Sequence, residues 1–130
     1  MRLLLALLTI VTCDVPEVDR PATAAEARMI LAENAYLVVE SPHLPSLGLT
    51  DCVDKVIWVR PGVHIGPILV HEAVHVLQAE ALGCGAFYAA YALNPDAFEN
   101  PAYAQEYRFY GCDNDVLEAE RPELSPELCD

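Results

Sequence analysis

Three chemically active side chains lie close together in the segment ILVHEAVHVLQ, residues 68–78, which is otherwise apolar. His71 and His75 are four residues apart, and Glu72 directly follows the first histidine. On a helix, residues four apart lie on one face one turn apart, so both imidazoles can point at one centre. This pattern is typical of the HExxH metal site, in which neutral imidazoles bind zinc and the glutamate deprotonates a water. The alternative interpretation is a pair of satisfied core histidines.

The sequence offers two carboxylates as a third metal ligand. A catalytic zinc site usually has three protein ligands and one open position. No histidine follows His75, and position 81 is alanine, so a third imidazole is excluded downstream. Glu99 and Glu106 are the candidates. Because seven residues of helix separate them by about 10 Å along the axis, they cannot both reach one metal ion.

The motif HEAVHVLQ, followed by FENPAYAQE, resembles small bacterial gluzincins, a group of HExxH zinc metallopeptidase domains. These carry HExxHxxQ and then a helix with Glu-x-x-Ala. The positions that match are His71, Glu72, His75, Gln78, Glu99, Ala102 and Tyr103.

The resemblance covers roughly residues 56–110 and implies that Glu99 is the third ligand. Pro101 departs from the pattern, because it lacks an N–H and kinks a helix interior. We therefore expect the helix that carries Glu99 to begin shortly before Pro101, with Asp96 near its start.

Helix and strand signals alternate along the chain. Residues 21–35 predict a helix that Thr23 caps, with Glu26 completing a capping box. Residues 35–40 and 54–62 are rich in β-branched and aromatic side chains and predict two short strands joined by a loop.

Three further helices are expected in the second half of the chain. The HExxH helix should run from Pro67 to Gly83, followed by residues 85–93 and 97–111. The fold class predicted is α+β: a minimal zincin-like domain with a short β-sheet packed on the HExxH helix and further helices.

Composition limits the classes of partner. The chain has 130 residues, of which 54% are hydrophobic and 21% charged, so it is long enough for one small folded domain. A net charge of -13 argues against a nucleic acid partner. The expected partner is a peptide or protein substrate.

The N-terminus predicts export. Residues 1–12 are typical of a signal peptide, with Arg2 before an apolar stretch that is too short to span a bilayer. The following Cys13 resembles the acylated cysteine of bacterial lipoproteins, so contact with a membrane is expected only through that candidate lipid anchor; ordinary cleavage is the alternative. The protein is expected to be periplasmic, envelope-anchored or secreted, with a zincin-like domain over residues 22–112 and an acidic tail over residues 113–130.

The cysteines are consistent with an oxidising compartment. Removing Cys13 from the five leaves four, which are expected to form two disulfides, and sequence allows three pairings. The four are Cys52, Cys84, Cys112 and Cys129.

The expected function is zinc-dependent peptide-bond hydrolysis, with Glu72 as the general base. The alternative is a non-catalytic zinc-binding or envelope-associated interaction domain that retains the HExxH helix. Tyr103, Tyr107 and Tyr110 fall at helical spacing and are interpreted as core or groove residues, with one phenol as a candidate to stabilise an oxyanion. His64 is interpreted as a surface histidine, and the alternative is that it assists at the transition state.

Overall fold

The computed structural model describes residues 15–109, which form a three-stranded sheet and four helices. The predicted α+β class is confirmed. The elements in chain order are α2 (Ala24–Glu33), β1 (Leu37–Glu40), β2 (Gly48–Asp51), β3 (Val56–Val59), α3 (Ile65–Leu82), α4 (Cys84–Leu93) and α5 (Pro95–Phe109). The expected signal peptide over residues 1–12, the candidate lipid anchor on Cys13, Tyr110 and the acidic tail over residues 113–130 lie outside the described residues.

The sheet is mixed, with strand order β1-β3-β2. β1 pairs with β3 in parallel and β2 pairs with β3 antiparallel. The two strands expected from β-branched runs are β1 and β3. The segment interpreted as a connecting loop contains β2 as a further strand, so that part of the prediction is wrong.

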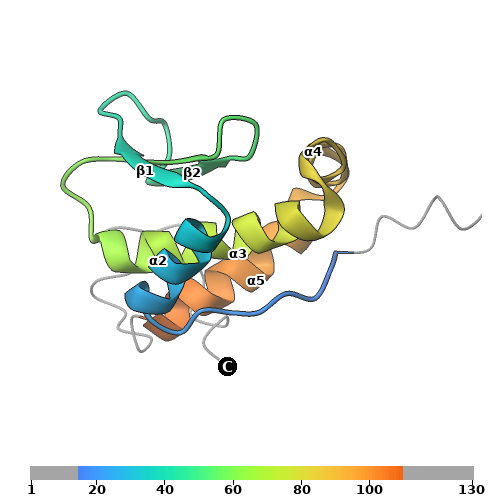
Figure 1. Cartoon of the computed structure of the whole chain (residues 1–130), viewed down its shortest axis with the longest axis horizontal. Coiled ribbons are helices and arrows are strands. Elements are labelled where there is room, and N and C mark those ends of the chain that lie inside the picture. The colour runs from blue at the N-terminus through green and yellow to red at the C-terminus, as the bar shows by residue number, and fades with distance from the viewer. Residues whose placement is uncertain (1–14, 110–130) are drawn as a thin grey trace, which may run out of the picture.

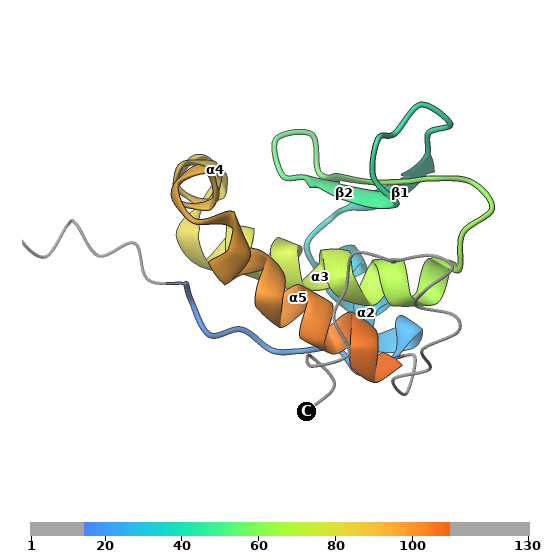
Figure 2. The ribbon, with the colours of Figure 1, turned by 180° about the vertical axis from the view of Figure 1, so that it is seen from behind.

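α3 is the central element of the fold, and it carries the HExxH motif. Figures 1 and 2 show the sheet on one side of α3, with α2 and α5 against the other side. Inward-facing residues of β3, Ile57 and Val59, are fully buried, as are Ile68 and Val70 of α3. The sheet therefore packs on the HExxH helix, as the sequence predicts.

The helix ends follow local signals. Thr23 Oγ1 accepts a hydrogen bond from the backbone N–H of Glu26, at 3.1 Å, and so caps α2 as expected. Gly83 terminates α3 with a φ of 90°, a conformation that glycine adopts without steric cost, and the chain turns there into α4.

α5 is longer than its proline content suggests. It begins at Pro95, whose missing N–H costs nothing in a first turn, and it continues through Pro101 to Phe109. The helix thus begins before Pro101, as expected. Glu99 consequently lies near the start of a helix that also carries Glu106 two turns later.

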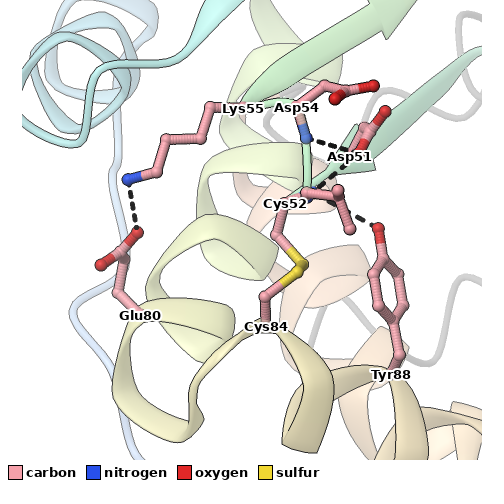
Figure 3. Close-up of a disulfide and its surroundings, with 8 residues drawn as sticks. Asp51, Cys52, Asp54, Lys55, Glu80, Cys84 and Tyr88 are labelled. Carbon is pink, nitrogen blue, oxygen red and sulfur yellow. Dashed lines mark hydrogen bonds and ion pairs between the residues drawn. A yellow bond between two sulfur atoms is a disulfide. The ribbon is translucent and has the colours of Figure 1, made fainter.

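A disulfide joins the end of β2 to the start of α4. Cys52 and Cys84 are bonded, with their Cα atoms 5.6 Å apart, and the phenol oxygen of Tyr88 accepts a hydrogen bond from the Cys52 backbone N–H at 3.3 Å (Figure 3). Both cysteines of this disulfide lie within the described residues, whereas the other two expected partners, Cys112 and Cys129, lie outside them.

Over residues 15–109, no helix combines the length and apolar character that crossing a bilayer requires.

Candidate metal centre

The HExxH side chains are buried within α3. A helix that is apolar on all sides belongs in a protein interior, and α3 fits this description except for a few polar residues. His71, Glu72 and His75 are 2%, 3% and 5% exposed. The Nε2 atoms of His71 and His75 lie 3.2 Å apart, so the two imidazoles converge on one point as the spacing predicts.

Glu99 brings a carboxylate from α5 to the same point. Its Oε1 lies 3.1 Å from His71 Nε2 and is in close contact with His75 Nε2. Ligand atoms at 2.0–2.1 Å from a tetrahedral zinc ion are about 3.3 Å from one another. Two of the three separations, 3.2 Å and 3.1 Å, are close to that value, whereas Glu99 Oε1 and His75 Nε2 lie closer together than it, so the three atoms gather around one point without yet having the spacing of bound ligands.

Gln78 fixes the protonation of His75. Its amide nitrogen donates to the Phe98 carbonyl at 3.1 Å, which leaves Gln78 Oε1 facing His75 Nδ1 at 2.8 Å. Because an amide oxygen only accepts, His75 Nδ1 must carry the hydrogen. The Nε2 atom of neutral His75 is then a bare lone pair directed at the centre.

Glu106 contacts the Nδ1 atom of His71, as Gln78 contacts the Nδ1 atom of His75. Its Oε1 lies 2.8 Å from His71 Nδ1, on the opposite side of the ring from Glu99, and Glu106 is fully buried. The carboxylate favours a hydrogen on Nδ1, which again leaves Nε2 as a lone pair. Glu106 is thus placed to orient the His71 ring rather than to reach the centre itself.

The centre requires a cation. Two imidazole lone pairs and one carboxylate oxygen face a single point, and none of these three atoms carries a hydrogen when the imidazoles are neutral. Either a metal ion or a proton relieves their repulsion. The donor set, two imidazoles and a carboxylate with fixed outer contacts, could hold a metal ion.

Proton uptake at the centre is reflected in two shifted pKa values. Burial lowers the pKa of His71, but the charge of Glu72 and hydrogen bonds with Glu106 and Glu99 outweigh burial and raise it to about 10. Burial raises the pKa of Glu99, but hydrogen bonds with His71 and His75 hold it well below its usual range. The metal-free centre therefore carries a proton at neutral pH.

Glu72 lies beside the ligand atoms but is held separately. The nearest ligand-type atoms of His71, Glu72 and His75 lie within 4.8 Å of one another, so this buried group could hold a metal ion. Glu72 Oε2 lies 3.8 Å from His71 Nε2, farther than Glu99 Oε1 does. Its other oxygen, Oε1, accepts a hydrogen bond from the Thr50 hydroxyl at 3.1 Å.

The centre lies in a cleft of about 300 Å³. β2 contributes Gly48, Leu49 and Thr50 to one wall, and α4 contributes Phe87, Tyr88 and Tyr91 to another. α3 supplies His71, Glu72 and His75, and α5 supplies Glu99 and Tyr103. The cleft is therefore bounded by aromatic side chains and contains the candidate metal centre.

Two tyrosines contact the centre. The Tyr91 hydroxyl donates to Glu99 Oε2 at 3.0 Å, so only Oε1 of that carboxylate faces the histidines. Burial and the neighbouring Glu99 carboxylate both raise the pKa of Tyr91, which keeps its phenol protonated. The Tyr103 ring packs edge-on against His71, with 4.7 Å between ring centroids.

The other predicted residues lie elsewhere. Tyr107 is 1% exposed and belongs to the core rather than to the cleft. His64 precedes the first turn of α3 and does not line the cleft. His43 is exposed.

Three contacts of the centre do not follow from the sequence. Gln78 belongs to the recognised motif, but the motif does not indicate what it contacts, and no sequence pattern marks Tyr91 or Thr50 as functional residues. Their roles depend on which elements pack against α3. Thr50 in particular lies on the strand that was interpreted as a loop.

Searches against family models, curated proteins and solved structures found no match to this chain.

Proposed function

We propose that this chain is a zinc-dependent peptidase in which His71, His75 and Glu99 bind the metal ion and Glu72 is the general base. The observation that carries the proposal is the convergence of three acceptor atoms beside a carboxylate that Thr50 holds: His71 Nε2 lies 3.2 Å from His75 Nε2 and 3.1 Å from Glu99 Oε1. That division into three ligands and one separate carboxylate is what hydrolysis of a peptide bond requires.

Zinc is the metal that best suits this donor set. Two imidazoles among three ligands favour zinc over magnesium or calcium, because imidazole is a borderline ligand and those two metals prefer several hard oxygen ligands. When bound there, zinc supplies Lewis acidity, which acidifies water to a pKa near ~7 and polarises a carbonyl oxygen.

Glu72 performs the proton transfers in this proposal. With Oε1 engaged by Thr50, the carboxylate presents Oε2 to the cleft, 3.8 Å from His71 Nε2. Oε2 accepts a proton from the attacking water as its oxygen bonds to the scissile carbonyl carbon. Glu72 then delivers that proton to the departing amine nitrogen as the C–N bond breaks, so the carboxylate is regenerated.

The cleft supports a peptide as the substrate. β2 pairs on one side only within the described sheet, and three of its residues, Gly48 to Thr50, line the cleft together with Ser46 just before the strand. An extended peptide can pair with the backbone of such an edge strand. The opposite wall presents aromatic side chains from α4, which can bury an apolar substrate side chain.

We also propose that the domain works outside the cytoplasm. The Cys52–Cys84 disulfide persists in an oxidising compartment such as the periplasm or the extracellular space. This agrees with the export expected from residues 1–12 and includes the envelope-anchored form expected from Cys13.

The test measures metal content and peptide cleavage in the same preparations. Purified without chelator, the protein should contain about one zinc ion per chain and cleave members of a peptide library, and a chelator should abolish cleavage. Glu72→Gln should keep the zinc and lose activity about 100-fold or more, because the amide retains the shape of Glu72 but not its basicity. Glu80→Gln, on the same helix but exposed, is the matched control and should change neither quantity.

Two results would redirect the proposal. A protein that binds zinc yet cleaves no peptide would be the non-catalytic zinc-binding domain that the sequence left as the alternative. Loss of zinc in Glu72→Gln would make Glu72 a ligand, in line with its closeness to both histidines.

A further inference from the structure

β2 contributes one buried hydroxyl to the cleft, and it contacts the candidate general base. Thr50 is 6% exposed, and its Oγ1 lies 3.1 Å from Glu72 Oε1 and 3.2 Å from the Glu72 backbone carbonyl. We infer that Thr50 is a positioning residue that keeps Glu72 acting as a base rather than as a metal ligand. The inference rests on the proposed function and adds to it the residue that separates the two roles.

The hydrogen bond has one possible direction. Both oxygens of Glu72 near Thr50 are acceptors, and the threonine hydroxyl has a single hydrogen to donate. A carboxylate is the stronger acceptor of the two. Thr50 therefore ties Glu72 Oε1 to β2, and Glu72 Oε2 is the oxygen left nearest to His71.

Glu72 needs such a restraint because it lies near enough to the histidines to act as a metal ligand instead. Its carboxylate already lies within 4.8 Å of the histidine nitrogens. A rotation about its side-chain bonds would bring it into the position that a water must occupy for hydrolysis. The hydrogen bond from Thr50 opposes that rotation from the side of the sheet.

Gly48 allows β2 to approach closely enough for this contact. A Cβ atom at position 48 would lie 2.5 Å from Ile68 Cγ2 and 3.3 Å from both Glu72 Cγ and Glu72 Oε2. Residues two apart on a strand share a face, so Gly48 and Thr50 both face α3. The absence of a side chain at position 48 thus positions the hydroxyl at position 50.

The test compares two substitutions of Thr50. Thr50→Val removes the hydroxyl and keeps the branched shape, whereas Thr50→Ser restores the hydroxyl. Thr23→Val is the matched control, since it removes a threonine hydroxyl that caps α2 outside the cleft. All variants are compared at equal concentrations of folded protein.

The expected kinetic effect is on kcat. In Thr50→Val, kcat for a cleaved peptide should fall about 10- to 100-fold while KM stays within about threefold. Thr50→Ser should recover kcat to within about threefold of the parent, and Thr23→Val should match the parent. An unchanged kcat in Thr50→Val, or a loss that Thr50→Ser does not restore, would overturn the inference.

A second readout does not depend on activity. In protein loaded with cobalt(II), the visible absorption reports the number of ligands, and intensity falls when a ligand is added. Thr50→Val should show weaker bands because Glu72 joins the ligands, and Thr50→Ser should show the parent spectrum. A Thr50→Val spectrum identical to the parent's would overturn the inference.

The two readouts separate this inference from the proposed function. If the parent binds cobalt but cleaves no peptide, the proposed function fails, and the spectra of the two Thr50 variants still decide whether Thr50 restrains Glu72. If the parent binds no cobalt, both the inference and the proposed function are overturned.

Discussion

Each histidine of the centre is held through the nitrogen that faces away from it. His71 has Glu106 at 2.8 Å from Nδ1, and His75 has the Gln78 amide oxygen at the same distance. The two acceptors differ in charge, so they act differently on the rings. The carboxylate raises the basicity of the His71 ring, whereas the neutral amide fixes the tautomer of His75.

At the residue scale, Glu99 and Glu106 are predicted to contribute unequally to zinc affinity. Glu99→Ala should remove most of the affinity, because it deletes an atom of the ligand group, 3.1 Å from His71 Nε2. Glu106→Ala should weaken binding by about 10- to 100-fold, the usual effect of losing an outer carboxylate. Competition with a chelator of known affinity measures both.

Asp96→Asn is the control for these variants, since it removes one charge from the exposed first turn of α5. It should leave zinc affinity nearly unchanged. If Glu106→Ala costs more affinity than Glu99→Ala, the assignment of the third ligand is wrong.

The sequence offered two candidates for the third metal ligand, Glu99 and Glu106, and only one of them was expected to act at the centre. Helical rise places Glu99 and Glu106 about 10 Å apart, which excludes both from binding one metal ion. It does not exclude both from contacting one imidazole, because the ring has two nitrogens on opposite sides. The structure shows this arrangement around His71, and it depends on the packing of α5 against α3.

At the element scale, α4 is the cleft wall with the least packing. Of its ten residues, Phe87 is buried, while Tyr88 and Leu93 are 41% and 76% exposed. The Cys52–Cys84 disulfide ties the start of α4 to the end of β2, which lies on the facing wall (Figure 3). The bond therefore fixes the spacing of the two walls.

Removing this disulfide should loosen the cleft and destabilise the domain. Because the bond closes a loop of 32 residues, the double variant Cys52→Ala, Cys84→Ala should lose about 3 to 4 kcal/mol in the free energy of unfolding. KM for a cleaved peptide should rise more than kcat falls, since the groups proposed to act in catalysis lie on α3 and α5. Urea unfolding and steady-state kinetics are the measurements.

A substitution nearby that breaks only a surface contact provides the comparison. Glu80→Gln removes the ion pair between Glu80 and Lys55, whose side chains are 42% and 44% exposed, respectively. This variant should lose no more than about 1 kcal/mol in the free energy of unfolding. Equal losses in the two variants would show that the disulfide adds nothing beyond a surface contact.

The sequence predicted the helices better than the sheet. Thr23 and Gly83 mark helix ends through their own backbone and capping chemistry, so these ends could be located without knowing the fold. α5 begins at Pro95, two residues before the predicted helix over residues 97–111. β2 has no comparable signal, because Gly48 is a poor strand residue. β2 forms because β3 pairs with it and α3 accepts the glycine at close range, and both causes are tertiary.

At the scale of the whole molecule, the centre places carboxylates and imidazoles inside the main core. Glu72 and Glu106 are at most 3% exposed and lie among the apolar residues that join α3 to α5 and to the sheet. Burying charge without a partner is costly, so the stability of the domain depends on the cation that neutralises this group. In the metal-free protein that cation is a proton, and stability must then vary with pH.

The pH dependence of the metal-free protein follows from two pKa shifts. The pKa of His71 is raised from 6.5 to about 10 on folding, so its contribution to stability is fully present below pH 6.5 and is lost as pH rises toward 10. The pKa of Glu99 is depressed from 4.5, so its contribution is present above pH 4.5 and is lost as pH falls. With chelator present, the unfolding temperature should be highest between about pH 4.5 and 6.5 and should decline from pH 6.5 to 10. Excess zinc should reverse the decline above pH 6.5, because the metal replaces the proton and binds more tightly as the histidines deprotonate. Calorimetry with chelator and with zinc measures both curves; a chelated protein that becomes more stable from pH 6.5 to 9 would contradict the buried proton.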